Sequence, residues 1–365
     1  MRITFALPEL SGLSGGFRVI AQYTRHLLDQ GHEVSFAVRR FNHVPGPKRL
    51  FLNLIGLRRP VSPLGPASGH FKGIDVPVFH LDEARPVHAL GLPDADAIIS
   101  TFWTTAEWAD RLPPSKGQHI HFIQGYEDFN PVFSKRVTAV YRQWNDKIVV
   151  ASWLKAKFLA EFGQDSIVAM NGVDIDHFDA PARSRNLRPR IGFIYATLPD
   201  KNSRMAIEVV KRLRAIHPDI DFIAFGSTPP PPDFPAFVAY ETSPDQDRIP
   251  AIYQSCDLWL FVTRREGFGL PILEAMASRT PVVATPAGAA PDLIDGRNGV
   301  ISSFDAEEFT QAVLDFLGRS PEMWRAASEA AFRTAHQRDL RRAARDFEAA
   351  VLTYLKRGCR SARLR

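Results

Sequence analysis

Short apolar runs alternate with amphipathic segments along most of this chain. In its first part, continuous apolar runs predict buried parallel strands, because a strand covered on both faces of its sheet has few polar positions. Residues 15–30 space their apolar positions as a helix does and end at Gly31, a common helix stop. The predicted strands of this part are 3–7, 33–38, 75–79, 97–100, 119–123 and 147–151.

A second part with the same alternation follows residues 180–189. That segment contains two prolines and three arginines, a composition typical of a linker. The proline run at 229–232 predicts a loop. The predicted strands are 190–196, 221–225, 258–262, 281–285 and 300–302, with helices at 204–216 and from 306 onward, the last of them at 341–356.

Strands that alternate with helices predict the α/β class, with doubly wound parallel sheets. A chain of 365 residues is long for a single core, so two domains are expected. We predict one Rossmann-like domain over residues 1–180 and a second over 181–340. Residues 341–365 are predicted to form a helix that packs back on the first domain and ends in a basic tail.

Composition and charge add one further feature. The start of the chain lacks the pattern of a signal peptide, no apolar window suits a membrane span, and there are only two cysteines, so a cytoplasmic protein is expected.

From Arg39 to Pro60, basic residues flank the apolar stretch 50–57 without any acidic residue. This pattern and the basic tail suit peripheral contact with the inner face of the cell membrane, and a solvated loop fits equally. No basic stripe carries interleaved aromatic residues, so nucleic acid is not expected as a partner.

The most informative motif is EGFGLPILE, which runs from Glu266 to Glu274. It follows the apolar run 258–262 and has Pro271 where a helix would begin. A strand, a glycine loop and a helix N-terminus present backbone N–H groups and a positive dipole end to an anion. The two carboxylates border this loop, so the motif predicts a ligand with phosphate and hydroxyl groups, such as a sugar nucleotide.

Together with PVVATPAG at 281–288, GRNG at 296–299 and NGVD at 171–174, this motif resembles the retaining glycosyltransferases of family 4, the group 1 glycosyltransferases. The resemblance covers the second half well and the first half more loosely. It implies the GT-B fold, in which two Rossmann-like domains face a cleft. It also implies metal-independent, retaining transfer of a hexosyl or deoxyhexosyl group from a nucleotide-sugar donor to a glycan or lipid-linked acceptor in cell-surface polysaccharide synthesis. The donor is a co-substrate, and no cofactor is expected.

The resemblance further implies roles for residues of the second half. Glu274 would bind the ribose diol of the donor and Glu266 the hydroxyls of the transferred sugar. Lys201 would balance the charge of the leaving phosphate. The backbone amides of the intervening loop would line the sugar and the diphosphate; these residues are Gly267, Phe268, Gly269 and Leu270.

One position departs from the family pattern. Ala196 stands where relatives often carry an arginine that contacts the donor diphosphate. With that arginine absent, a nearby basic side chain would hold the phosphate instead. The candidates are Arg204, Arg264 and Arg265.

In the first half, Gly15 and Gly16 open the first predicted helix and would let the donor approach the backbone closely. A nicotinamide dinucleotide site is the rival interpretation. The spacing differs from GxGxxG, and the strand 33–38 ends in Arg39 and Arg40 rather than an acidic residue, although an NADP site can use arginines.

The residues after the predicted strand 119–123 are candidates as well. We expect Gln124 and Glu127 to act in catalysis together with Glu266 and Lys201, and Tyr126 and Glu127 to contact the acceptor. Their Gln-x-Tyr-Glu pattern resembles a subset of the family that includes bacterial rhamnosyltransferases. His119 and His121, on the same strand, fit a structural role equally well.

Two observations limit the alternatives. The four Asp-x-Asp pairs lie beside predicted turns and are interpreted as solvated or capping residues, and no His/Cys cluster has the spacing of a metal site. Two rival functions remain open: a sugar-nucleotide epimerase on the same fold, and an inactive scaffold for glycan assembly. The missing arginine favours the scaffold, whereas both glutamates argue against it.

Overall fold

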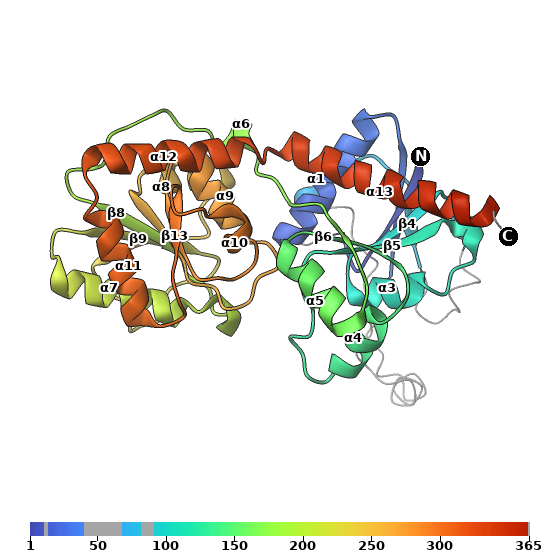
Figure 1. Ribbon diagram of the computed structural model, residues 1–365, viewed down its shortest axis with the longest axis horizontal. Coiled ribbons are helices and arrows are strands. Elements are labelled where there is room, and N and C mark those ends of the chain that lie inside the picture. The colour runs from blue at the N-terminus through green and yellow to red at the C-terminus, as the bar shows by residue number, and fades with distance from the viewer. Residues whose placement is uncertain (11–13, 40–67, 82–90, 364–365) are drawn as a thin grey trace. The chain divides into compact units, whose positions relative to one another are not determined.

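The computed structural model describes residues 1–10, 14–39, 68–81 and 91–363 (Figure 1). By their internal contacts these residues form two compact units. Unit 1 consists of Met1–Val149, Lys155–Ala169 and Ala344–Arg365, and unit 2 of Val150–Leu154 and Met170–Ala343. The predicted basic insert lies, apart from Arg39, outside the described residues.

Unit 1 is built on a parallel sheet of seven described strands in the order β3-β2-β1-β4-β5-β6-β7. Its middle strand β1 pairs with β2 on one side and with β4 on the other. The strands are β1 (Arg2–Leu7), β2 (Glu33–Val38), β3 (Val78–His80), β4 (Ala97–Ser100), β5 (Gln118–Ile123), β6 (Asp146–Val149) and β7 (Ile167–Val168).

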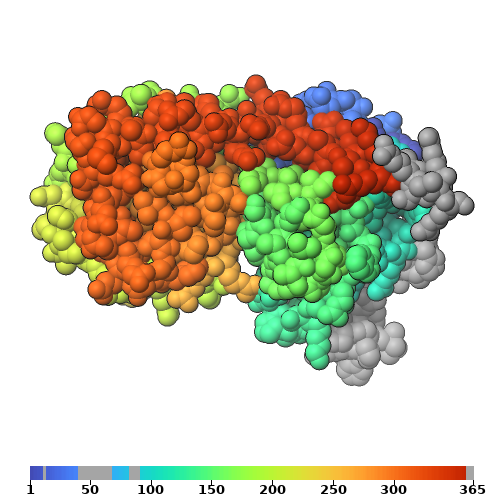
Figure 2. Space-filling view, in the orientation of Figure 1, coloured from blue at the N-terminus to red at the C-terminus, as the bar shows by residue number. Residues whose placement is uncertain are grey.

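Helices flank this sheet, and an aromatic core fixes two of them. The ring of Phe347 lies 4.9 Å from that of Tyr23 and 4.8 Å from that of Phe122, so α13 and α1 are packed against β5. The part of α13 from Ala344 onward runs along the surface of unit 1 (Figure 2). The helices of unit 1 are α1 (Gly15–Asp29), η1 (Gly69–Phe71), α3 (Trp103–Ala109), η3 (Pro114–Lys116), α4 (Ser134–Tyr141) and most of α5 (Ser152–Phe162) and α13 (Leu340–Arg363).

Unit 2 repeats this architecture with six parallel strands in the order β10-β9-β8-β11-β12-β13. The strands are β8 (Arg190–Ile194), β9 (Asp221–Gly226), β10 (Val238–Thr242), β11 (Leu258–Phe261), β12 (Val282–Ala284) and β13 (Gly299–Ile301). The helices are α6 (Ile175–Phe178), η4 (Pro199–Lys201), α7 (Ser203–Ile216), η5 (Gln246–Arg248), α8 (Ile249–Gln254), α9 (Leu270–Ala277), α10 (Ala290–Leu293), α11 (Ala306–Leu317) and α12 (Pro321–His336).

Both sheets confirm the predicted α/β class. Most predicted strands are present with ends shifted by a few residues, and α13 is longer than the predicted 341–356. Residues 180–189 form neither helix nor strand, and there Arg183 and Asn186 each bind a carboxylate oxygen of the buried Asp257 at 2.9 Å. The strands β7 and β10 were not predicted.

Within the described residues, no helix has the length and apolar character needed to cross a lipid bilayer. The tail beyond Arg363 and the apolar stretch 50–57 fall outside those residues. The predicted membrane contact of the insert and the tail therefore stays a prediction.

Candidate functional site

Two loops at the carboxyl edge of the unit 2 sheet are tied together. The first follows β8 and the second follows β11, which is its neighbour in the sheet. The backbone N–H of Arg264 donates to the carbonyl of Asp200 at 2.8 Å, and the Asn202 amide donates to the carbonyl of Val262 at 3.1 Å. Asn202 adopts the left-handed conformation with φ 54°, which turns the chain into α7. In parallel α/β sheets this edge is where ligands bind.

The side chains of Lys201 and Glu266 join the same two loops. The Lys201 ammonium forms an ion pair with the Glu266 carboxylate, and the two side chains are 38% and 22% exposed. Both groups are therefore within reach of a ligand in solution. Sequence reasoning placed both in one site without predicting that they bind each other.

The glycine loop before α9 is held by its backbone. Gly269 has φ 97°, and a Cβ atom there would lie 2.9 Å from the Phe261 ring. The Phe268 carbonyl accepts from the Ala289 N–H at 2.7 Å, and the Gly267 carbonyl accepts from the Trp153 indole at 2.9 Å. With Leu270 as its first residue and Pro271 next, α9 begins at the predicted position. Residues 267–270 are thus fixed beside the ion pair.

Glu274 lies on α9 and is buried, with 6% of its surface exposed. Its carboxylate accepts a hydrogen bond from the Tyr253 hydroxyl at 2.9 Å. Tyr253 is itself fully buried on α8, and its carbonyl accepts from the Thr280 hydroxyl at 2.7 Å. Tyr253 was not predicted as a site residue, because nothing in its local sequence links it to a glutamate 21 positions later.

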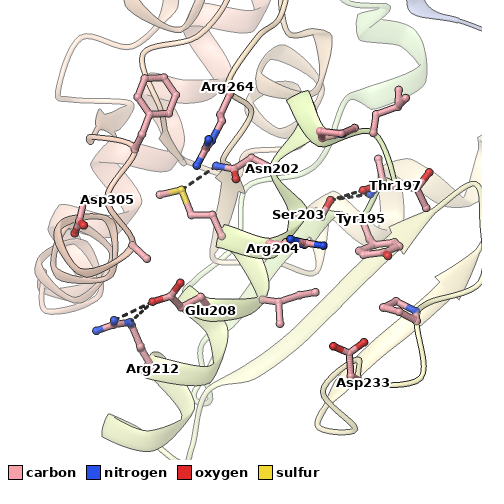
Figure 3. Close-up of a pocket in the computed structure, with 18 of the residues that line it drawn as sticks. Tyr195, Thr197, Asn202, Ser203, Arg204, Glu208, Arg212, Asp233, Arg264 and Asp305 are labelled. Atoms are coloured by element: carbon pink, nitrogen blue, oxygen red, sulfur yellow. Dashed lines mark hydrogen bonds and ion pairs between the residues drawn. The ribbon is translucent and has the colours of Figure 1, made fainter.

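A cavity of about 900 Å³ lies beside these loops in unit 2. Among the predicted donor residues its lining includes Arg204 and Arg264, but not Lys201, Glu266 or Glu274. Figure 3 shows Tyr195 and Asp233 on one side of α7, with Arg264 and Asp305 on the other. The Ser203 hydroxyl donates to the Ala196 carbonyl and accepts from its N–H, both at 2.8 Å, which fixes the loop at the cavity wall (Figure 3).

The three candidate arginines are all exposed. Arg204 and Arg264 line the cavity from α7 and from the loop after β11, whereas Arg265 is not among the lining residues. Positive charge is thus available at the cavity around Ala196, the position that lacks the arginine.

In unit 1, Gly15 and Gly16 begin α1 after Ser14, as predicted. The Gln124 amide, just beyond β5, donates to the Gly16 carbonyl at 3.2 Å. A Cβ atom at Gly16 would lie 3.3 Å from the same amide. The structure therefore brings Gly16 and Gln124 together at the carboxyl edge of the unit 1 sheet.

Glu127 and Tyr126 follow in the same loop. The Glu127 carboxylate accepts from the Trp103 N–H at 2.7 Å, at the start of α3, and the Glu127 N–H donates to the Tyr141 hydroxyl at 3.0 Å. Burial raises the pKa of Glu127 to about 8. Tyr126 donates to Glu161 at 2.8 Å, and the Lys157 ammonium lies 4.2 Å from its ring centre. Burial and the Glu161 carboxylate raise the pKa of Tyr126 above its ordinary value.

The remaining predicted candidates are His119, His121 and Asp174, and their contacts fit a structural role. His121 is buried in unit 1, and burial lowers its pKa. His119 lies 2.8 Å from the Ser100 hydroxyl. Asp174 caps α6 by accepting from the His177 N–H, which confirms the capping interpretation for that Asp-x-Asp pair. In the described part of the chain, no three His, Cys, Asp or Glu side chains are grouped as a metal site would require.

Comparison with solved structures identifies the fold of this protein. The chain aligns over 97% of its length with Anabaena Alr3699/HepE, which it covers completely, at a TM-score of 0.70 and 16% identity. It also covers 98% of TarM, over 96% of this chain, at a TM-score of 0.72 and 12% identity. These similarities and the two parallel sheets show the two-domain GT-B fold.

Sequence comparisons then show which family part of the chain is similar to. Residues 188–319 match the family described as "Glycosyl transferases group 1". The chain is 29% identical over 212 residues to the GDP-mannose-dependent alpha-(1-6)-phosphatidylinositol monomannoside mannosyltransferase of Mycolicibacterium smegmatis, a match covering 49% of this chain and 56% of that one. It is 46% identical over 67 residues, 18% of this chain and 19% of the other, to the lipopolysaccharide core biosynthesis mannosyltransferase LpcC of Rhizobium leguminosarum bv. viciae.

Residues 188–319 of the chain match the group 1 glycosyltransferases, the family that the EGFGLPILE motif predicted. The chain spans about half the length of the first of these relatives and a fifth of the second. The matched residues 188–319 contain Lys201, Glu266 and Glu274.

Proposed function

We propose that this protein is a retaining glycosyltransferase that moves a sugar from a nucleotide-sugar donor to a glycan or lipid-linked acceptor. The observation that carries the proposal is the pair of tied loops in unit 2, which places Lys201 and Glu266 in contact at the carboxyl edge of the sheet. A cation and a carboxylate at that edge suit the two parts of a donor, its diphosphate and its sugar hydroxyls.

In this proposal the protein lowers the barrier by orienting the substrates and stabilising charge, without a covalent nucleophile. Lys201 and Arg264 balance the negative charge on the departing diphosphate. Glu266 accepts hydrogen bonds from the sugar, and Glu274 accepts them from the ribose. The helix α9 begins beside these groups, and the positive end of its dipole favours the same anion.

Unit 1 supplies the acceptor contacts of the proposal, together with the glycines expected to approach the donor. Gly16 and Gln124, joined by a hydrogen bond, lie at the carboxyl edge of its sheet with Tyr126 and Glu127 in the same loop. We assign acceptor contacts to Tyr126 and Glu127. The protonated form of Glu127 is favoured near neutral pH, since its pKa is about 8, so it can donate a hydrogen bond to an acceptor oxygen.

We take mannose as the first sugar to test, because several relatives are named as mannosyltransferases and one is named as dependent on GDP-mannose. The experiment incubates the full chain in EDTA with GDP-mannose, UDP-glucose or dTDP-rhamnose, each with a bacterial lipid extract. Mass spectrometry then measures sugar added to lipid, and NMR the anomeric configuration of the product. Transfer with retained configuration supports the proposal. Interconversion of the donor sugar without any acceptor product would indicate an epimerase instead.

A further inference from the structure

The glycine loop before α9 receives a hydrogen bond from a distant segment of the chain. The Trp153 indole N–H donates to the Gly267 carbonyl at 2.9 Å. Trp153 is partly buried and lies in the first turn of α5, which belongs to unit 2. The N–H of Ser152, the first residue of α5, donates to the Asp292 carboxylate of α10 at 3.0 Å. The turn that carries the indole is therefore itself anchored in unit 2.

A second segment, which follows β12, also holds the glycine loop. The Ala289 N–H donates to the Phe268 carbonyl at 2.7 Å. Gly288 lies so close that a Cβ atom at its position would be 2.5 Å from the Phe268 oxygen. Two successive carbonyls of the loop are thus each bound by a different part of the chain.

These two bonds set the direction of two backbone N–H groups. In a trans peptide the carbonyl and the N–H that follows it point in opposite directions. The Phe268 N–H therefore points away from Trp153, and the Gly269 N–H points away from Ala289. In the described part of the chain neither N–H has an acceptor, although Phe268 is only 3% exposed and Gly269 is buried. Because unpaired N–H groups in such surroundings are rare, this pair suits the oxygen atoms of a ligand.

We propose that Trp153 is a positioning residue of the transfer reaction, whose indole holds the loop so that the Phe268 N–H binds an oxygen of the transferred sugar. The loop begins directly after Glu266, the residue to which we assign the sugar hydroxyls. Trp153 acts through the loop and does not contact the donor itself. This role rests on the proposed function, whereas the hold on the loop can be measured without any substrate.

The test compares Trp153→Phe with Trp324→Phe in the full chain. Each variant loses one indole N–H that donates to a backbone carbonyl of unit 2 at 2.9 Å. The control bond joins Trp324 of α12 to Asp257, which lies outside the glycine loop. Asp292→Ala is a second variant, because it releases the first turn of α5 without changing the indole. Circular dichroism verifies that each protein is folded.

Hydrogen–deuterium exchange gives the readout that needs no substrate. The Ala289 N–H reports on the loop, since the Phe268 carbonyl is its acceptor. In Trp153→Phe this amide should exchange about fivefold faster than in the wild type, because the loop has lost one of its two bonds. In Trp324→Phe its exchange should be unchanged. Unchanged exchange in Trp153→Phe, or an equal increase in the control, overturns the proposal.

Sugar transfer and calorimetric titration with a nucleoside diphosphate give the second readout. Trp153→Phe should lower kcat at least about tenfold and change diphosphate affinity less than about twofold, because Lys201 and Glu274 are untouched. Asp292→Ala should show the same split to a smaller degree, and Trp324→Phe neither change. Unchanged kcat in Trp153→Phe, or an equal loss of affinity and kcat, overturns the proposal.

Failure of the proposed function has a different signature. It would appear as a wild type that neither transfers sugar nor binds any nucleoside diphosphate. The exchange of the Ala289 amide decides separately whether Trp153 holds the loop.

Discussion

The Lys201 ammonium and the Glu266 carboxylate form an ion pair that joins the loop after β8 to the loop after β11. In our proposal each of these groups has a different part of the donor as its partner. Donor binding must therefore replace this pair with two new contacts, the diphosphate for Lys201 and the sugar for Glu266. A nucleoside diphosphate without sugar supplies only the first of them.

Glu266→Gln is accordingly expected to bind a nucleoside diphosphate as tightly as the wild type or up to about fivefold more tightly. The reason is that the part-exposed ion pair, of about 0.2–1 kcal/mol, no longer competes for Lys201. Sugar transfer should fall strongly in the same variant. Calorimetric titration measures the first effect and product formation the second. A loss of diphosphate binding as large as that in Lys201→Met would contradict the assignment.

Glu274→Gln should weaken nucleotide binding by tenfold or more, because a charged acceptor forms stronger hydrogen bonds to a diol than a neutral amide does. Tyr253→Phe removes the hydroxyl that positions this carboxylate and should have a smaller effect. Titration of both variants with the same nucleotide gives the comparison. Unchanged affinity in Glu274→Gln would remove the ribose assignment.

Gly269→Ala should disturb the glycine loop. Its φ of 97° is unfavourable for alanine, and the new Cβ would lie 2.9 Å from the Phe261 ring. Gly296→Ala is the control, since Gly296 has φ 84° and no atom within 4 Å of its Cβ position. Both should lose about 1–2 kcal/mol of unfolding free energy from backbone strain, and Gly269→Ala more than the control. Equal melting temperatures and equal nucleotide affinities would show that the loop adapts freely.

Glu127 should make stability depend on pH. Its pKa is raised from the ordinary 4.5 to about 8, so between these values the folded state retains a proton that the unfolded chain has released. The contribution of Glu127 to the free energy of unfolding is complete below about pH 4.5, and it is lost as the pH rises through 8. The glutamine in Glu127→Gln cannot ionise, so this variant should show a flatter dependence of stability on pH in this range. Thermal melts of both proteins from pH 5 to 9 test it, and parallel profiles would contradict the raised pKa.

Much of the fold follows from local sequence. The runs at 33–38, 97–100 and 258–262 are apolar because their strands are covered on both faces, and burial of that kind is visible in composition. β10 lies at the edge of its sheet and only Val238 in it is buried, so it has no such run. β7 has two residues, too few for any pattern.

The site was predicted as a set of residues rather than as contacts. The motif itself places Glu266 and Glu274 around a helix start, because strand, glycine and proline are local signals. The partners of those residues come from elsewhere in the chain. Lys201 meets Glu266 and Trp103 meets Glu127 only because neighbouring parallel strands bring their following loops to one edge.

The central claim, that unit 2 holds a nucleoside diphosphate sugar, is tested most directly by calorimetric titration in EDTA. GDP, UDP, ADP and dTDP are each added to the wild type, Lys201→Met and Glu274→Gln. We predict saturable binding of at least one nucleotide to the wild type and at least tenfold weaker binding to both variants. No binding by any nucleotide, or equal binding by all three proteins, would contradict the claim.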